Sequence, residues 1–290
     1  MEHTYSALPL EHMLVVPQWQ GSSAVDARRL VMGAHWLSAL LPAVRRTFVS
    51  VDADPAPDRD GVRQLDVLTR TLAASRQALE GWGEAALFTV GGDCGVELAP
   101  IAHAVGRHGD RLAVVWFDAH PDLNTPDSSP SGGFHGMVLR TVLGQGPAAL
   151  LPPPGQRLSA ERLVLAGVRS IDPAEQRFID SARIRRVSVD RLDEPSALVA
   201  AVAETGATHV YIHIDLDVLD PEQFTALSFP EPEGLSPARL RAALCALTDA
   251  FPLAGLGITE HAPAPEPEAD GDPAGNDRVL REIFAGVSVG

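Results

Sequence analysis

Short apolar runs alternate with longer mixed segments along most of this chain. The runs are rich in Val, Ile, Leu and Phe and show no regular polar alternation, which is typical of strands buried on both faces of a sheet. They cover residues 13–16, 48–51, 86–90, 112–117, 163–168, 211–216 and 253–258.

The longer segments between these runs predict helices. They cover residues 24–41, 62–81, 174–180 and 236–250. Ser236 and Pro237 suit the N-cap and the first position of the last helix. Two stretches rich in Pro, Gly and short polar residues, 121–136 and 263–275, predict loops. Strands alternating with helices predict an α/β fold, which we expect to be a three-layer α/β/α sandwich with a central, mostly parallel sheet, formed by residues 1–290 as a single domain.

Composition narrows the class of protein. The hydrophobic content of 45% and the charged content of 21% are ordinary for a globular protein. A net charge of -15 argues against a nucleic-acid partner, which requires a basic surface, and is compatible with attracting small cations. The two cysteines form no disulfide framework, and Cys245 lies in an apolar helical run. No segment has the pattern of a signal peptide or a membrane span, so we expect no membrane partner and a cytoplasmic location.

The strongest chemical signal follows the apolar run at residues 112–117. The chain passes directly from this run into Asp118-Ala119-His120-Pro121-Asp122. Residues two apart on an extended chain point to the same side, so the three polar side chains can converge beyond the carboxyl end of the strand. Open parallel sheets place their sites there. Two carboxylates and an imidazole suit Mn²⁺ and similar divalent ions.

A second run, at residues 211–216, repeats this geometry. It leads into Asp215-Leu216-Asp217. Burying two carboxylates together without a cation is costly. The two strand ends together offer enough ligands for two metals that share bridging groups. Such a pair, about 3.5–4 Å apart, activates a water near neutral pH and stabilises both partners of a hydrolysis.

These motifs together resemble the arginase (ureohydrolase) family. The resemblance rests on Gly91-Gly92-Asp93-Cys94, on the Asp-Ala-His-x-Asp segment and on Asp215-x-Asp217-x-x-Asp220-Pro221. It continues in the same order through Ser131-Gly132-Gly133-Phe134-His135-Gly136 and Gly257-Ile258-Thr259-Glu260, and covers about residues 86–263. The resemblance implies hydrolysis of the guanidino group of arginine or of a derivative such as Nω-hydroxyarginine, giving ornithine and urea or a substituted urea. It also implies two divalent metal ions, with Mn²⁺ as the expected ion, and a homo-oligomer that is a trimer or a hexamer.

The resemblance also assigns the metal ligands. Asp118 and Asp215 are expected to bridge both ions, Asp122 to complete one site, and His120 and Asp217 to complete the other.

Two further residues complete the catalytic set that begins with Asp118. His135 is expected to transfer a proton, because the ordinary pKa of histidine lies near working pH. Glu260 is expected to pair with the substrate guanidinium, since a bidentate carboxylate–guanidinium pair fixes both charge and plane.

A distal polar set resembles the one with which the family recognises the amino-acid end of arginine. Asn124, Ser129 and Ser131 could bond the α-carboxylate, and Asp172 and Glu175 resemble the acidic pair near the α-ammonium. This set favours an amino-acid substrate over a decarboxylated one such as agmatine.

Three positions depart from the family pattern. Gly133 stands where an asparagine is usual and Phe229 where a threonine is usual, which implies a reshaped pocket. Cys94 stands where the family has a histidine that binds the same metal as Asp122. A thiolate is a softer ligand, better matched to zinc or iron than to Mn²⁺. Cys94 can therefore bind a metal directly, leave its place to water, or cause the loss of one metal.

Two other classes of function stay open at this point. One is a catalytically silent relative that acts by binding, which rests on Cys94 alone. The other is a one-metal amide hydrolase of the deacetylase type, against which Asp122 and Glu260 argue. His213, beside the second metal motif, is either an orienting residue behind the ligands or a buried histidine without a special role.

Overall fold

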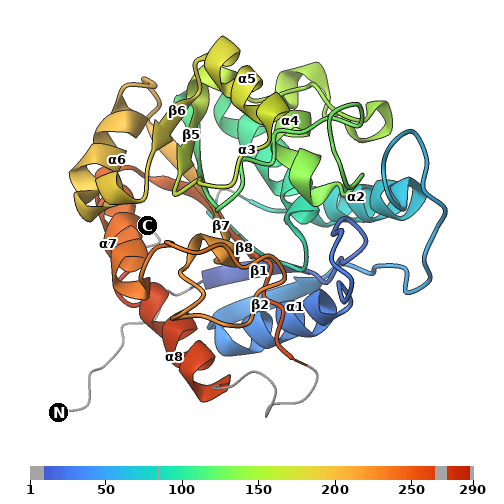
Figure 1. Ribbon diagram of the computed structural model, residues 1–290, viewed down its shortest axis with the longest axis horizontal. Helices are drawn as coiled ribbons and strands as arrows, with labels where there is room; N and C mark the ends of the chain where they lie inside the picture. The colour runs from blue at the N-terminus through green and yellow to red at the C-terminus, as the bar shows by residue number, and fades with distance from the viewer. Residues whose placement is uncertain (1–9, 84, 265–272, 288–290) are drawn as a thin grey trace.

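The computed structural model describes residues 10–83, 85–264 and 273–287. Its centre is an eight-stranded sheet in the order β2-β1-β3-β8-β7-β4-β5-β6, and every neighbouring pair of strands is parallel (Figure 1). The strands are β1 (Leu10–Val16), β2 (Ala43–Phe48), β3 (Leu87–Gly91), β4 (Leu112–Phe117), β5 (Leu163–Ala166), β6 (Arg185–Val187), β7 (His209–Asp215) and β8 (Leu253–Thr259).

Helices cover both faces of this sheet, as Figure 1 shows. Buried residues of α1, α6, α7 and α8 pack on one face, and buried residues of α2, α3, α4 and α5 pack on the other. The helices are α1 (Arg29–Leu40), α2 (Leu65–Leu79), α3 (Leu98–His108), α4 (Val138–Val142), α5 (Pro173–Ala182), α6 (Pro195–Ala203), α7 (Pro237–Ala250) and α8 (Pro273–Ile283). The predicted three-layer α/β/α sandwich is therefore confirmed.

The central strands explain why their sequences lack polar alternation. In β4, Ala113, Val115 and Phe117 join the core on one face. Leu112, Val114 and Trp116 join the core on the other face, so every position of the strand is buried. A strand covered by helices on both sides needs apolar residues at both phases of its pleat.

The edges of the sheet differ from the prediction. The strand expected at 48–51 instead spans Ala43–Phe48, with exposed Arg45 and Arg46 in its middle. An edge strand is covered less fully and tolerates charge, so its pattern is not the uniform apolar one. The three-residue β6 at the other edge has two arginines and was not predicted.

The helix and loop predictions are confirmed in outline. Ser236 caps α7 by accepting a hydrogen bond from the Arg239 backbone N–H at 3.3 Å. The helix expected at 24–41 begins only at Arg29. Residues 121–134 contain no helix or strand. Much of the loop expected at 263–275 lies outside the described residues, but its last three residues belong to α8.

Candidate metal centre and active site

Four adjacent strands bring the motif residues together. Strands β3, β8, β7 and β4 are neighbours at the centre of the sheet, and all point the same way. Cys94, Glu260, Asp215 and Asp118 follow or end these strands, so the topology alone places them at one edge. This is the edge at which open parallel sheets bind ligands.

The same local device turns the chain at three of these strand ends. One side-chain oxygen of an aspartate accepts the backbone N–H two residues later. Asp93 accepts from Gly95 at 2.9 Å, Asp118 from His120 at 2.6 Å, and Asp215 from Asp217 at 2.8 Å. This turn bends the chain away from the end of each strand and fixes one oxygen of the aspartate.

One candidate metal group is formed by Asp118, His120 and Asp217. One ligand atom from each lies within 4.8 Å of the others. His120 Nδ1 is 2.9 Å from Asp217 Oδ2 and 3.5 Å from Asp118 Oδ1. The other oxygen of Asp217 accepts the Ala119 backbone N–H at 2.9 Å. The structure thus brings together three of the residues predicted to hold one ion.

A second candidate group is formed by Cys94, Asp215 and Glu260. Cys94 is fully buried, and its Sγ lies 3.1 Å from Asp215 Oδ2 and 3.1 Å from Thr259 Oγ1. Burial, and then the charge of Asp215, raise the pKa of the Cys94 thiol well above its ordinary value. In the absence of a cation, Cys94 is therefore a thiol that donates to Asp215.

His213 also approaches Cys94, from strand β7. Its Nε2 lies 3.5 Å from Cys94 Sγ, and the two residues form a third group with Asp118. The His213 ring stacks on Trp116 with centroids 3.5 Å apart, and its Nδ1 is 3.6 Å from Glu97 Oε2. His213 is thus oriented directly behind the site, although the sequence did not distinguish this from an ordinary buried position.

Asp122 lies apart from these groups but lines a cavity together with His120, Asp215 and Asp217. It belongs to none of the three compact groups, while its Oδ2 is buried without a hydrogen-bond partner. Its φ of 52° is in the left-handed region, as is the φ of 62° at Glu260.

The buried carboxylates of this site are suited to binding cations. Burial, and then the charge of Asp217, raise the pKa of Asp118 to about 7. Burial raises the pKa of Asp122, Asp215 and Glu260 well above their ordinary values. Burial is the first cause of each shift, so the ionised form of each carboxylate is disfavoured unless further positive charge is near. Asp122 Oδ2 and Glu260 Oε2, both buried and unpartnered, lack the partner that a bound cation would provide.

His135 lies beside Glu260. Its Nδ1 is 3.7 Å from Glu260 Oε1, and its ring packs against Phe229 with centroids 5.2 Å apart. Burial, and then the nearby charge of His120, lower the pKa of His135 to about 4. His135 is therefore a neutral imidazole near pH 7.

A cavity of about 240 Å³ opens over these residues. At its inner end are His120, Asp122, Asp215, Asp217 and His135. Its outer wall contains all of the residues predicted to recognise the amino-acid end of a substrate, namely Asn124, Ser129, Ser131, Asp172 and Glu175. Phe229 lines the cavity as well.

The outer residues are held by their own hydrogen bonds. Ser129 and Ser131 accept backbone N–H groups of Gly132 and Gly133, at 3.0 and 3.1 Å. Each hydroxyl proton thus remains free to donate to a ligand. Glu175 differs, because its two oxygens accept the backbone N–H groups of Leu123 and Asp172, at 2.8 and 3.0 Å. Glu175 fixes the metal-binding loop to the start of α5, a role that the sequence did not indicate.

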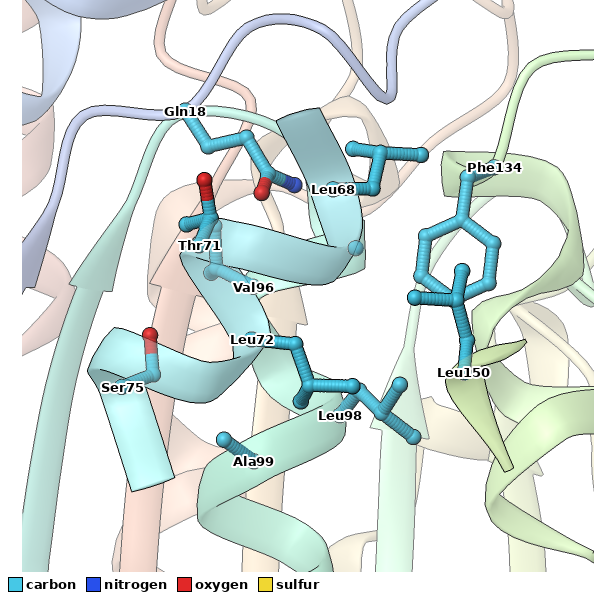
Figure 2. A pocket seen from close by; sticks show the side chains of 11 residues that line it. Gln18, Leu68, Thr71, Leu72, Ser75, Val96, Leu98, Ala99, Phe134 and Leu150 are labelled. Atoms are coloured by element: carbon cyan, nitrogen blue, oxygen red, sulfur yellow. The ribbon is translucent and has the colours of Figure 1, made fainter. Parts of the chain in front are cut away.

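A second, much smaller cavity lies between α2 and α3 (Figure 2). Its volume of about 10 Å³ is room for roughly one water molecule. Gln18, Thr71 and Ser75 supply polar groups to it. Gln18 also donates to Asp93 at 3.0 Å. This cavity is too small for an amino acid, and the candidate active site is the cavity of about 240 Å³ that the motif residues line.

Comparisons with known proteins agree with this geometry. A model of the Arginase family matches residues 29–283. The arginase of Bacillus caldovelox is 36% identical over 156 residues, which cover 51% of this chain and 52% of that protein. The arginase of Staphylococcus aureus (strain MRSA252) is 33% identical over 140 residues, which cover 46% of each chain. The aligned part of this chain thus spans about half the length of these curated relatives.

A solved structure resembles the fold over nearly its whole length. The crystal structure of Entamoeba histolytica arginase in complex with L-ornithine superposes with a TM-score of 0.83 at 25% identity. The superposition covers 97% of this chain and 99% of that one. Among the described residues, no helix is long and apolar enough to cross a membrane.

Proposed function

The chain belongs to the arginase family, and from this premise we propose that it is a metal-dependent amidinohydrolase of arginine or of an arginine derivative such as Nω-hydroxyarginine. The products are ornithine and urea, or ornithine and a substituted urea. The observation that carries this proposal is the gathering of Asp118, Asp215, Asp217 and Glu260 with His120 and Cys94 in compact groups, beside a cavity that Asp122, Asp215 and Asp217 line.

We propose two divalent metal ions, with Mn²⁺ as the native ion. Asp118, Asp215, His120 and Asp217 would hold one ion, and Asp118, Asp215, Asp122 and Cys94 would hold the other. The compact group of Asp118, His120 and Asp217 supports the first site, and the compact group that contains Cys94 and Asp215 supports the second. When bound, the two ions supply an activated water and positive charge beside the guanidino carbon.

Glu260 receives the guanidinium in this proposal. Its Oε1 accepts the Cys94 backbone N–H at 3.3 Å, which fixes the carboxylate plane, while Oε2 is buried without a partner. A guanidinium that donates two parallel hydrogen bonds supplies that missing partner.

The bond that breaks joins the guanidino carbon to the side-chain nitrogen of the substrate. The oxygen of water becomes the oxygen of urea, and the departing amine takes up a proton. His135 lies beside Glu260 and is a neutral imidazole, so its ring N–H can pass a proton to the departing amine while the proton released by the attacking water restores the ring.

The outer wall of the cavity supports an amino-acid substrate. The hydroxyls of Ser129 and Ser131 and the amide of Asn124 offer donors for an α-carboxylate. Asp172 offers an acceptor for an α-ammonium. Agmatine has no carboxylate and leaves these donors unused, which disfavours it.

The test is product release by the Mn²⁺-loaded protein from arginine, Nω-hydroxyarginine and agmatine, measured side by side. Ornithine from either amino acid supports the proposal, and the ratio of kcat/KM identifies the preferred one. A Ser131→Ala variant is expected to lose kcat/KM towards the amino acids but not towards agmatine. Release of putrescine alone would show a different substrate class.

One observation favours a second candidate, a relative that binds without turnover. The Cys94 thiol donates to Asp215 Oδ2, an oxygen that the two-metal arrangement requires as a ligand. Protein that holds both metals yet releases no product from the three compounds would favour this candidate.

Two further expectations concern the setting of the enzyme. We propose a homo-oligomer, a trimer or a hexamer, which light scattering can test. We propose the cytoplasm as its compartment, which is supported by free thiols at both cysteines, Cys94 and Cys245.

A further inference from the structure

The side of the His135 ring that faces away from Glu260 is held by a residue that the sequence did not single out. Ser23 lies in the loop that follows β1. Its Oγ is 3.1 Å from His135 Nε2, and its backbone N–H donates to the same nitrogen at 3.4 Å. The ring nitrogen on the other side, Nδ1, is the one near Glu260.

The loop that carries Ser23 is anchored to the metal-motif region. The Gly21 backbone N–H donates to Asp93 Oδ2 at 2.8 Å, and the Gly21 carbonyl accepts the His135 backbone N–H at 3.0 Å. A Cβ at Gly21 would lie 2.4 Å from Asp93 Oδ1, so only glycine allows this approach. Asp93, Gly21 and His135 are thus bonded in series, and Ser23 follows two residues later.

Gly133 leaves room for the contact between Ser23 and His135. A Cβ at this position would lie 2.8 Å from His135 Cδ2 and 3.1 Å from the Ser23 Cβ. An asparagine side chain would therefore meet both residues. The contact between Ser23 and His135 is thus compatible with glycine at position 133 and would be crowded by a side chain there.

The Ser23 backbone N–H also determines where the ring proton lies. An N–H group can only donate, so Nε2 must accept. The proton of the neutral imidazole is then on Nδ1, which faces Glu260 Oε1 at 3.7 Å. The Ser23 hydroxyl can donate to the same nitrogen, so both groups of Ser23 favour the tautomer with its proton on Nδ1.

We propose that Ser23 is a positioning residue for His135, which fixes the ring and keeps its transferable proton on the side of Glu260. This inference rests on the proposed function, because it assumes that His135 moves a proton in the reaction. Phe229 completes the arrangement by packing against the ring at 5.2 Å, which leaves it little freedom to turn.

The kinetic test compares three variants of the Mn²⁺-loaded enzyme. Ser23→Ala removes the hydroxyl and is expected to lower kcat about ten-fold with KM changed less than two-fold, since a lost hydrogen bond of about 1.4 kcal/mol in the transition state has that effect. Ser23→Thr keeps the hydroxyl and is expected to recover most of the rate. Ser22→Ala is the matched control, because the Ser22 hydroxyl accepts the Ala24 backbone N–H at 3.2 Å. Equal kcat values for wild type and Ser23→Ala would overturn the inference.

A second measurement does not depend on turnover. Nitrogen-15 NMR of histidine side chains in the metal-free protein distinguishes the two tautomers, with His135→Gln used for assignment. We expect the Nδ1–H tautomer at His135, and an Nε2 resonance that moves in Ser23→Ala but not in Ser22→Ala. The Nε2–H tautomer, or an Nε2 resonance unaffected by Ser23→Ala, overturns the inference. Absence of turnover in wild type, with the expected spectra, contradicts the proposed function and leaves the placement of Ser23 supported.

Discussion

Glu260→Gln tests separately how much the buried negative charge of Glu260 contributes to kcat/KM and how much it lowers the stability of the metal-free protein. The replacement keeps the shape of the side chain and removes the negative charge that is proposed to bind the guanidinium. Removing one partner of a buried, hydrogen-bonded charge pair costs about 3–5 kcal/mol. At about 1.4 kcal/mol per factor of ten, kcat/KM is expected to fall by roughly 10² to several 10³.

The same replacement is expected to leave the metal-free protein at least as stable as wild type. Burial, and then the charges of Asp93 and Asp217, raise the pKa of Glu260, so its ionised form is disfavoured in the fold. Glutamine removes that charge, and its amide can still accept the Cys94 backbone N–H. Activity and stability should therefore change in opposite directions, as is common at active sites.

The assay is steady-state ornithine release together with a thermal melt of the metal-free protein. Glu233→Gln is the matched control, because Glu233 is exposed and has a φ of 61° against 62° at Glu260. The control is expected to match wild type in both measurements. A Glu260→Gln variant that retains its kcat/KM, or that loses rate only because it melts at a much lower temperature, would refute the reasoning.

Three further predictions address the metals, the pH response and the pocket. Cys94→Ser is expected to weaken Zn²⁺ binding more than Mn²⁺ binding if Sγ is a ligand, as measured by competitive metal titration; equal effects would place Cys94 outside the coordination sphere. Burial raises the pKa of both Asp118 and Glu175 to about 7, so the folded, metal-free protein binds more protons than the unfolded chain between about pH 4 and pH 7. Its melting temperature in chelator should fall as pH rises through that window, and a rise would contradict the burial argument. Phe229→Thr should enlarge the cavity beside His135 and change the ratio of kcat/KM between arginine and Nω-hydroxyarginine; an unchanged ratio would show that Phe229 does not contribute to specificity.

Much of the fold was predictable because its central strands are buried on both faces. The run at 112–117 coincides with β4, since full burial imposes an apolar residue at every position. Edge strands escape this requirement, which is why the charged β2 was placed too late in the chain and β6 was missed. Local apolar content reports burial, and burial is incomplete at the edges of a sheet.

The candidate site was predictable where residues are close in sequence. Asp118 and His120 converge because they are two apart at a strand end, and the structure places them in one group with Asp217. Contacts between residues that are far apart in the sequence could not be predicted from local spacing. Ser23 and His135 are far apart along the chain, and only the packing of the loop after β1 against the site brings them together.

The buried residues that pack behind the candidate metal ligands were likewise not predictable from the local sequence. Glu97 is fully buried and accepts a hydrogen bond from Tyr211 at 2.8 Å, close to His213. A glutamate in a helical segment is usually exposed, so nothing in the local pattern indicated this position. Three-dimensional proximity, rather than residue type, identifies these orienting groups.

Oxygen-18 labelling tests the central claim most directly. The Mn²⁺-loaded protein is incubated with arginine in H₂¹⁸O, and the products are analysed by mass spectrometry; the same is done with Nω-hydroxyarginine. Hydrolysis of the bond between the guanidino carbon and the side-chain nitrogen predicts one labelled oxygen in urea or in the substituted urea, and none in ornithine. Labelled oxygen in the amino-acid product, or no labelled product from either substrate by protein that holds both metals, would contradict the account.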